Sequence, residues 1–403
     1  MKPLGTYLPG NVLPTVVVAT VLMLAGIAGL LALWEHETLL FACSCRLRQA
    51  RADAESAYAL YRLYPACPEL TGRGGYLLYD SLPLSRVFVE VRPWGLYETV
   101  TVTTSDSLLR VCRLCGAWPD AAKTLFYADG RSAVTLAGKT ELHGTLGLPR
   151  NGLVYGRVGS DFFCGTEIPR AAIGRSGGGL PEPDADAVTR IAALFAARPR
   201  IPHGTLPDSL WHSFLRDSAA VFGLGDAEVG DCSLRGRIVL YADELRIDSA
   251  CRMGHLLVCA RKVTVGCGAR IAAQLFARDT VVVEACAELE YPSGIYSGRY
   301  AEVGARARVD GYVIVCDTVG RKKVTASYRQ SRTARVRGLL WVDGIAQVQG
   351  VVSGRALLRQ AVWFSPQGYY KDMLYDFTLL ENPVTAQPLW LASVRRKEAV
   401  CVE

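Results

Sequence analysis

The chain repeats itself every 18 residues over a central stretch, and this repeat restricts the possible fold more than any other feature. Consecutive copies begin at Ile238, Leu256 and Gln274, and a fourth follows after a two-residue insertion. An 18-residue unit cannot bury its own apolar face, so it must stack on its neighbours. The repeat therefore predicts a solenoid. Its expected core residues fall into two aligned columns, namely Ile247, Val265, Val283 and Val303 in the first and Met253, Ile271, Leu289 and Val309 in the second.

A finer step of six residues separates the two columns within every copy. Three such steps make one turn of a triangular parallel β-helix, with a branched apolar residue pointing inward on each side. A set of ordinary antiparallel hairpins would explain alternation within each strand, but not the 18-residue register across three copies. The hand of the helix stays open. The same step recurs upstream at Leu136, Leu142 and Leu148, and downstream at Val336, Val342 and Val348.

The second strong feature is the apolar run from Val12 to Trp34, which carries no charge over 23 residues. At about 1.5 Å per residue, a helix of this length spans roughly 34 Å and can cross a bilayer with modest tilt. A cleaved signal peptide is the alternative, but the run is too long for one and no small-residue cleavage site follows promptly. We therefore expect a single-pass transmembrane helix, with the lipid bilayer as a partner.

Basic residues beside this helix bear on its orientation. Arg46, Arg48 and Arg51 follow the span within 17 residues, whereas Lys2 is the one basic side chain before it. Cytoplasmic flanks are richer in basic residues, so the pattern leans towards a cytoplasmic body at the bacterial inner membrane. The 13 scattered cysteines fit a reducing compartment. A short N-terminus before an apolar helix also resembles pilin-like subunits, whose bodies lie outside, so the side of the body stays open.

The fold class expected for the whole chain is mainly β, with an interrupted solenoid. The glycines Gly177–Gly179 and the prolines that follow indicate a flexible linker. A helix capped by Asp184 or Asp186 and a second short helix over Asp208–Val221 should follow it. The expected segments are an N-terminal tail (1–11), a transmembrane helix (12–34), a juxtamembrane helix (35–70), a small antiparallel β region (71–131), a first part of the solenoid (132–169), a linker and helical excursion (170–231), the main solenoid (232–365) and a C-terminal cap (366–403).

The residues that could carry chemistry do not form a known constellation. Cys112 and Cys115 make one C-x-x-C pair, but a zinc site needs two more ligands and a redox dithiol favours a strand-to-helix junction. His143 and His255 lie in coil-like stretches, where hexapeptide-repeat acyltransferases carry a general-base histidine, but neither has an evident donor site. The acids of the repeat form no ladder across copies. We therefore expect no catalytic residue, no cofactor and no metal site.

The solenoid behind an N-terminal membrane element resembles the bactofilins, which are bacterial polymer-forming cytoskeletal proteins. The resemblance covers roughly Cys232–Val315, with outlying pieces at Leu136–Leu148 and Val336–Gly350, and it rests on the repeat pattern. Bactofilin cores run without interruption, whereas this chain carries an excursion and an additional β region. Its plan is also similar to that of uncharacterised membrane-anchored envelope proteins of the Bacteroidetes type.

These features favour a structural function without enzymatic activity. The chain is expected to be a membrane-anchored scaffold in the bacterial cell envelope, which presents the solenoid to copies of itself or to envelope proteins. The formal charge of +7 is spread along the chain without a lysine–arginine tract, which argues against nucleic acid as a partner. Two alternatives stay open: an envelope enzyme that modifies glycans or acyl groups on a β-helix, and a pilin-like component of a secretion system.

Overall fold

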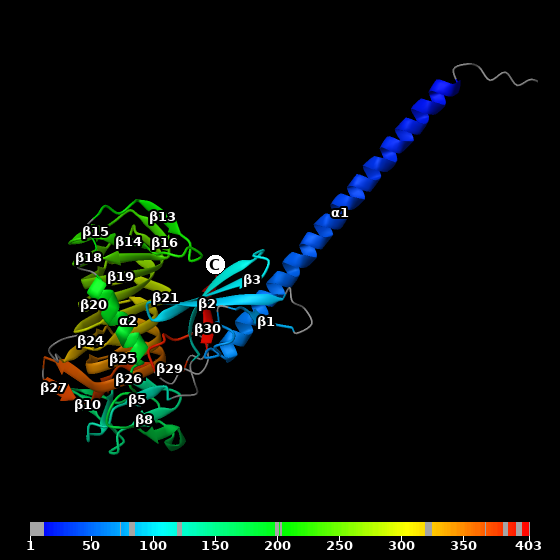
Figure 1. Cartoon of the computed structure of the whole chain (residues 1–403). Helices are drawn as coiled ribbons and strands as arrows, with labels where there is room; N and C mark the ends of the chain where they lie inside the picture. Colours follow the sequence, from blue (N-terminus) through cyan, green and yellow to red (C-terminus); the bar gives the residue numbers. More distant parts are fainter. Residues whose placement is uncertain are drawn as a thin grey trace, which may run out of the picture.

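The fold is mainly β, with a long N-terminal helix, a small antiparallel sheet and a large array of parallel strands (Figure 1). The computed structural model describes residues 12–72, 74–79, 85–118, 123–197, 201, 204–318, 325–366, 368–381, 386–391 and 397–402. The expected N-terminal tail, residues 1–11, lies outside these described residues.

The N-terminal apolar run belongs to one continuous helix, α1 (Val12–Leu63), rather than to separate membrane and juxtamembrane helices. No proline or glycine interrupts the chain between Trp34 and Leu63, so nothing breaks the helix after the apolar run. The helix ends ahead of Pro65, a residue that stops helices, so the expected juxtamembrane segment, 35–70, is helical only as far as Leu63. The 52 residues of α1 extend for about 78 Å. In the described residues α1 is the one helix long and apolar enough to cross a membrane, and its most apolar window is not buried by the rest of the protein.

The antiparallel sheet lies between α1 and the parallel array and has the strand order β1-β2-β3-β4-β30 (Figure 1). The expected small β region supplies the first four strands. The last strand comes from the expected C-terminal cap, and it pairs with β4 instead of covering the array. The bounds are β1 (Tyr76–Leu77), β2 (Arg86–Trp94), β3 (Tyr97–Thr104), β4 (Arg110–Ala117) and β30 (Lys397–Val402).

The parallel array is built from stacked levels. The strands of each level pair in parallel with the strands of the next level. Its strands, in chain order, are β5 (Leu125–Tyr127), β7 (Glu141–Leu142), β8 (Leu146–Leu148), β12 (Ile173–Arg175), β13 (Ser209–His212), β14 (Ala220–Gly223), β15 (Ala227–Val229), β16 (Ser233–Gly236), β17 (Ile238–Tyr241), β18 (Glu244–Ile247), β19 (Arg252–Val265), β20 (Arg270–Val283), β21 (Glu288–Ser297), β22 (Tyr300–Val303), β23 (Arg308–Val315), β24 (Ala326–Gln330), β25 (Arg335–Gln347), β26 (Gly350–Ser365) and β29 (Phe377–Leu380).

Smaller elements complete the end of the molecule around β8. β6 (Val134–Ala137), β9 (Leu153–Tyr155) and β28 (Met373–Tyr375) form a three-stranded parallel sheet. β10 (Arg157–Val158) and β11 (Asp161–Phe162) form a hairpin, and β27 (Gly368–Lys371) folds back antiparallel on the end of β26. A 3₁₀ turn, Arg170–Ala172, precedes β12.

Chain order and spatial order differ in the parallel array. β26 pairs with β5 through Ala356 and Leu125, and β29 pairs with β7 through Leu379 and Leu142. The segment expected as the first part of the solenoid therefore lies beyond the last level of the main part, and it already begins at β5. The expected cap is wrong for the same reason, because Phe377–Leu380 is an internal strand. A strand edge that is left open tends to pair with another strand. The edges of β26 and β29 are therefore paired with β5 and β7.

The excursion carries the chain back from this end of the array to the opposite end. Helix α2 (Ala185–Ala197) lies along the array, and Asp184 caps it by accepting hydrogen bonds from the backbone N–H groups of Asp186 (2.8 Å) and Ala187 (3.1 Å) (Figure 1). The expected capped helix is thus confirmed. The expected second helix over Asp208–Val221 is wrong, because the region forms β13 and β14. Parallel ladders with β16 and β17 satisfy their backbone groups instead.

Candidate functional site

The eight residues expected to form the core are brought together in one buried cluster inside the array, and none is more than 5% exposed. Val265 pairs with Ile247 on one side and Val283 on the other, and Val283 pairs with Val303. The second column is paired in the same way and continues in both directions. From one end to the other it comprises Leu210, Leu234, Met253, Ile271, Leu289, Val309, Val336, Val352, Leu379 and Leu142.

A third inward column escaped the sequence pattern. It runs through Val258, Leu275 and Ile295, all of which are buried in the same cluster. Val258 follows Met253 by five positions rather than six, so a uniform step of six misses it. The irregularity lies at His255, where the register between β19 and β20 shifts and the backbone takes a φ of 66°.

The outward face of the array is also apolar where other elements cover it. Cys259, Phe276 and Tyr296 are paired neighbours on this face, and all three are buried. They belong to a second core cluster that includes Ile191 and Phe195 of α2. Figure 1 shows α2 crossing these strands. Phe276 and Tyr296, which pair with each other, mark the face that α2 covers. These outward aromatic residues were the sequence signal that could have predicted the covered face.

The two histidines weighed as general bases lie in different surroundings. His143 is half exposed, and its Nε2 atom lies 4.0 Å from the Oε2 atom of Glu141, beyond hydrogen-bond distance. The backbone carbonyl of His255 accepts a hydrogen bond from the Trp94 indole N–H at 3.1 Å. This contact joins the array to the antiparallel sheet, so the stretch around His255 has a packing role.

The C-x-x-C pair does not form a joint site. Cys112 and Cys115 are three residues apart on β4, and side chains alternate along a strand, so they face opposite sides of the sheet. Cys112 is buried in the cluster shared with the array, and Cys115 is buried in the cluster shared with α1. No group of three or more His, Cys, Asp or Glu side chains in the described part of the chain is placed to hold a metal ion.

The helix–sheet junction buries polar side chains beside apolar ones. Ala54, Ala57, Tyr58 and Tyr61 lie on one face of α1, at the spacing of successive helical turns, and pack on the valines of β2 and β3. The Tyr61 hydroxyl donates a hydrogen bond to the Glu98 carboxylate at 2.5 Å. The Tyr58 hydroxyl and the Cys115 thiol share a second hydrogen bond, in which either group can be the donor. Burial raises the pKa of both tyrosines, with Glu98 and Cys115 adding to the effect, so both stay protonated near neutral pH.

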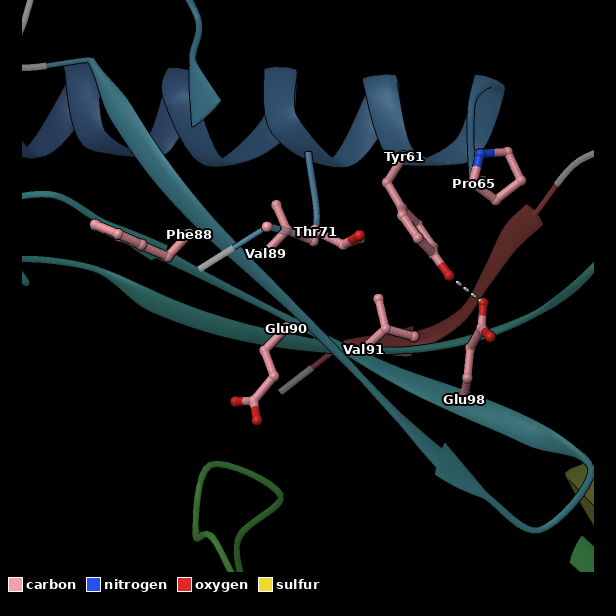
Figure 2. Close-up of a pocket in the computed structure, with 9 residues that line it drawn as sticks. Tyr61, Pro65, Thr71, Phe88, Val89, Glu90, Val91 and Glu98 are labelled. Carbon is pink, nitrogen blue, oxygen red and sulfur yellow. Dashed lines mark hydrogen bonds between the residues drawn. The ribbon is translucent and has the colours of Figure 1, made fainter. Parts of the chain in front are cut away.

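An open hollow of about 620 Å³ lies beside this junction (Figure 2). Figure 2 shows the Tyr61 hydroxyl pointing at Glu98, with Phe88 and Glu90 from β2 further along the same strand layer. The segment after the helix contributes Pro65 and Thr71. Glu98 and Tyr61 bond each other, so this arrangement fixes the helix to the sheet. It couples α1 to the antiparallel sheet.

Comparison of the chain with known protein families, with curated proteins and with solved structures finds no match. Function is therefore inferred from the surfaces of the molecule. The end of the array formed by β13, β14 and β15 is the most informative of them. Each of these strands pairs with one neighbour, respectively β16, β17 and β18, in the described residues. At this end the side chains of Trp211 and Val221 are 67% and 47% exposed.

Proposed function

We propose that this protein is a membrane-anchored scaffold of the bacterial cell envelope, and that its parallel array is a triangular β-solenoid. The 18-residue register between Ile247, Val265 and Val283 supports the solenoid, as does the third inward column through Val258. The unburied apolar part of α1 supports the membrane anchor, because such a surface is stable in hydrocarbon and costly in water. Arg46, Arg48 and Arg51 support the bacterial inner membrane with a cytoplasmic body.

The open end of the array carries the proposal of self-association. The outer edges of β13, β14 and β15 present backbone groups that a second parallel or antiparallel edge can pair with, apart from the Gly223 carbonyl, which accepts a hydrogen bond from the Gly204 N–H at 2.8 Å. Trp211 and Val221 add exposed apolar surface beside these edges. Proteins that stay monomeric blunt such edges with charges or prolines. β13 and β14 hold no proline, acid, lysine or arginine, whereas β15 carries Glu228, which is paired with Arg246 of the next level.

The partner that fits this end best is the same end of a second copy. A two-fold pair makes this end self-complementary, because an edge on the axis meets its own equivalent and the other two edges meet each other across it. Two-fold pairs are the commonest symmetry of soluble homo-oligomers. Rigid attachment of α1 to the sheet, through Tyr61 and Glu98, keeps each copy oriented relative to its anchor. The pair would therefore link two membrane anchors through one continuous run of stacked strands.

The test is the size of the full-length protein in detergent, measured by light scattering after gel filtration. We expect a dimer for the wild-type chain and a monomer for the double variant Trp211→Lys and Val221→Lys. Both side chains are exposed, so the substitutions leave the core intact. Phe364→Lys is the matched control, because Phe364 is 51% exposed on β26, far from this end. A wild-type monomer, or a dimer that the double variant leaves unchanged, would refute the open end as the contact.

A further inference from the structure

Two buried cysteines meet near the open end of the array. The Sγ atoms of Cys232 and Cys251 are 3.0 Å apart. Non-bonded carbon atoms pack at about 3.5–4.0 Å, and sulfur is the larger atom, so this contact is closer than ordinary packing. Both side chains point into the core cluster of the array, where Cys232 is 8% exposed and Cys251 is fully buried.

The backbone register holds the two cysteines side by side. Cys232 and Cys251 directly precede Ser233 and Arg252, which are paired residues of β16 and β19. The Arg252 N–H donates to the Cys232 carbonyl at 2.8 Å, so the ladder extends to the cysteines. Neighbouring strands lie about 4.8 Å apart, and in-register side chains of parallel strands point the same way. A disulfide needs Cα atoms roughly 4.4–6.8 Å apart with converging side chains, and this register supplies both.

Solvent reaches Cys232, but not the fully buried Cys251, from one side. An open hollow of about 450 Å³ is lined by Cys232 and Ser233, together with Asp208, Asp231, Ala250 and Arg252. A small disulfide reagent can enter this hollow and meet Cys232 first. Cys251 then lies behind it, at the distance from which it can attack.

We propose that Cys232 and Cys251 are a disulfide-forming pair that staples two successive levels of the array near its open end. The oxidant is a small-molecule disulfide or the disulfide of a thiol oxidoreductase. Cys232 loses its proton, and its Sγ attacks the disulfide of the oxidant, which releases one thiol. Cys251 loses its proton, and its Sγ attacks the Sγ of the resulting mixed disulfide, which releases the second thiol. Two protons and two electrons thus leave the pair, and the oxidant ends as two thiols.

The neighbouring levels explain why alanine is a clean replacement here. The position of Cys251 is occupied by Ala269, Ala287, Ala307 and Ala334 in the levels that follow, and all four are buried. Cys232→Ala therefore places in the column a side chain that the same column holds four times elsewhere. The variant should fold as the parent does and lose the link alone.

The test uses the full-length protein, purified in detergent under reducing conditions and then exposed to oxidised glutathione. Remaining thiols are alkylated, and the protein is digested with trypsin without reduction. Cleavage after arginine separates the two cysteines into the peptides Asp217–Arg235 and Ile247–Arg252, each with one cysteine. We expect these two peptides as a single linked species, and as separate alkylated peptides after reduction.

Thermal unfolding supplies a second readout. The link closes a loop over 19 positions, so the oxidised wild-type protein should melt roughly 5 °C above its reduced form. Cys232→Ala should melt with the reduced wild type under both conditions. Cys267→Ala, which removes an exposed cysteine elsewhere, should retain the linked peptides and the shift. Recovery of both peptides as alkylated thiols from the folded, oxidised protein, or a link that forms only in denaturant, would overturn the proposal.

Discussion

At the scale of single residues, the inward columns explain why a sequence with so many polar positions has a continuous core. Val265 lies between Ile247 and Val283, and all three are fully buried. Its neighbour Thr264 is only partly buried, since side chains alternate between the two faces of a strand. A charged side chain is therefore tolerated at position 264 but not at position 265.

Val265→Asp tests the register directly. The substitution buries a carboxylate without a partner, so we expect the free energy of unfolding to fall by about 3–5 kcal/mol. Thr264→Asp, one position away, should change it by less than about 0.5 kcal/mol because the side chain faces outward. Urea unfolding of the two variants measures the difference. Equal midpoints for both variants would mean that the alternation is assigned to the wrong face.

The reactivity of Cys232 should depend on pH. Burial, with the charges of Asp231 and Asp208 adding to it, raises the pKa of the Cys232 thiol above its ordinary value, although the Cys251 contact opposes this shift. The thiolate is the attacking species, and below the pKa its fraction grows with pH. Oxidation by glutathione disulfide should therefore accelerate about tenfold per pH unit above neutrality. A rate that is flat between about pH 7 and about pH 8 would contradict a protonated resting thiol.

At the scale of elements, the sequence predicted what local pattern determines and missed what distant contacts determine. The apolar helix, the capped helix after Asp184 and the two columns follow from periodicity and capping within short stretches. The strands β13 and β14 did not, because parallel pairing with β16 and β17 overrides their helical composition. Gln330 is another such case. It continues the column after Val303, and its amide donates to the Val351 carbonyl at 3.2 Å, which no local pattern signals.

The linker before α2 should be the first site of proteolysis. Gly178 and Gly179 have open space around them, whereas Gly177 and Asp184 are held by backbone hydrogen bonds to Asp129 (2.8 Å) and Trp390 (2.7 Å). Limited proteolysis should therefore cut between residues 177 and 186. The two fragments should stay associated on gel filtration, because β5 and β26 pair across the cut. First cleavage within Cys232–Val315 would contradict this division of the chain.

At the scale of the whole molecule, two stretches of chain that are far apart in sequence build one array. The excursion, residues 170–231, makes this possible. It carries the chain from the end that contains β8 to the end formed by β13, β14 and β15, where the repeats then begin. The sequence could not reveal the arrangement, because the junctions β26–β5 and β29–β7 join residues more than 200 positions apart. The cysteine pair was missed for a different reason: Cys232 and Cys251 are 19 positions apart, so a strict 18-residue repeat does not align them, and the register of β16 and β19 makes them neighbours.

The orientation of the body is testable with its exposed cysteines. Arg46, Arg48 and Arg51 favour a cytoplasmic body, so Cys164 and Cys267 should be shielded from a membrane-impermeant maleimide in intact spheroplasts. Both should be labelled after the membrane is permeabilised. Labelling of either cysteine in intact spheroplasts would place the body on the outer side, and oxidation of the Cys232–Cys251 pair would then be expected in the cell.

Electron microscopy of the full-length protein in detergent tests the central claim most directly. The ten paired residues from Leu210 to Leu142 make nine steps, which at about 4.8 Å each give an array of about 43 Å. Two copies joined through the open end should appear as straight rods of about twice that length, with one micelle-embedded helix per half. Particles with a single array and one helix, at concentrations where the protein is purified intact, would contradict a scaffold that assembles through this end.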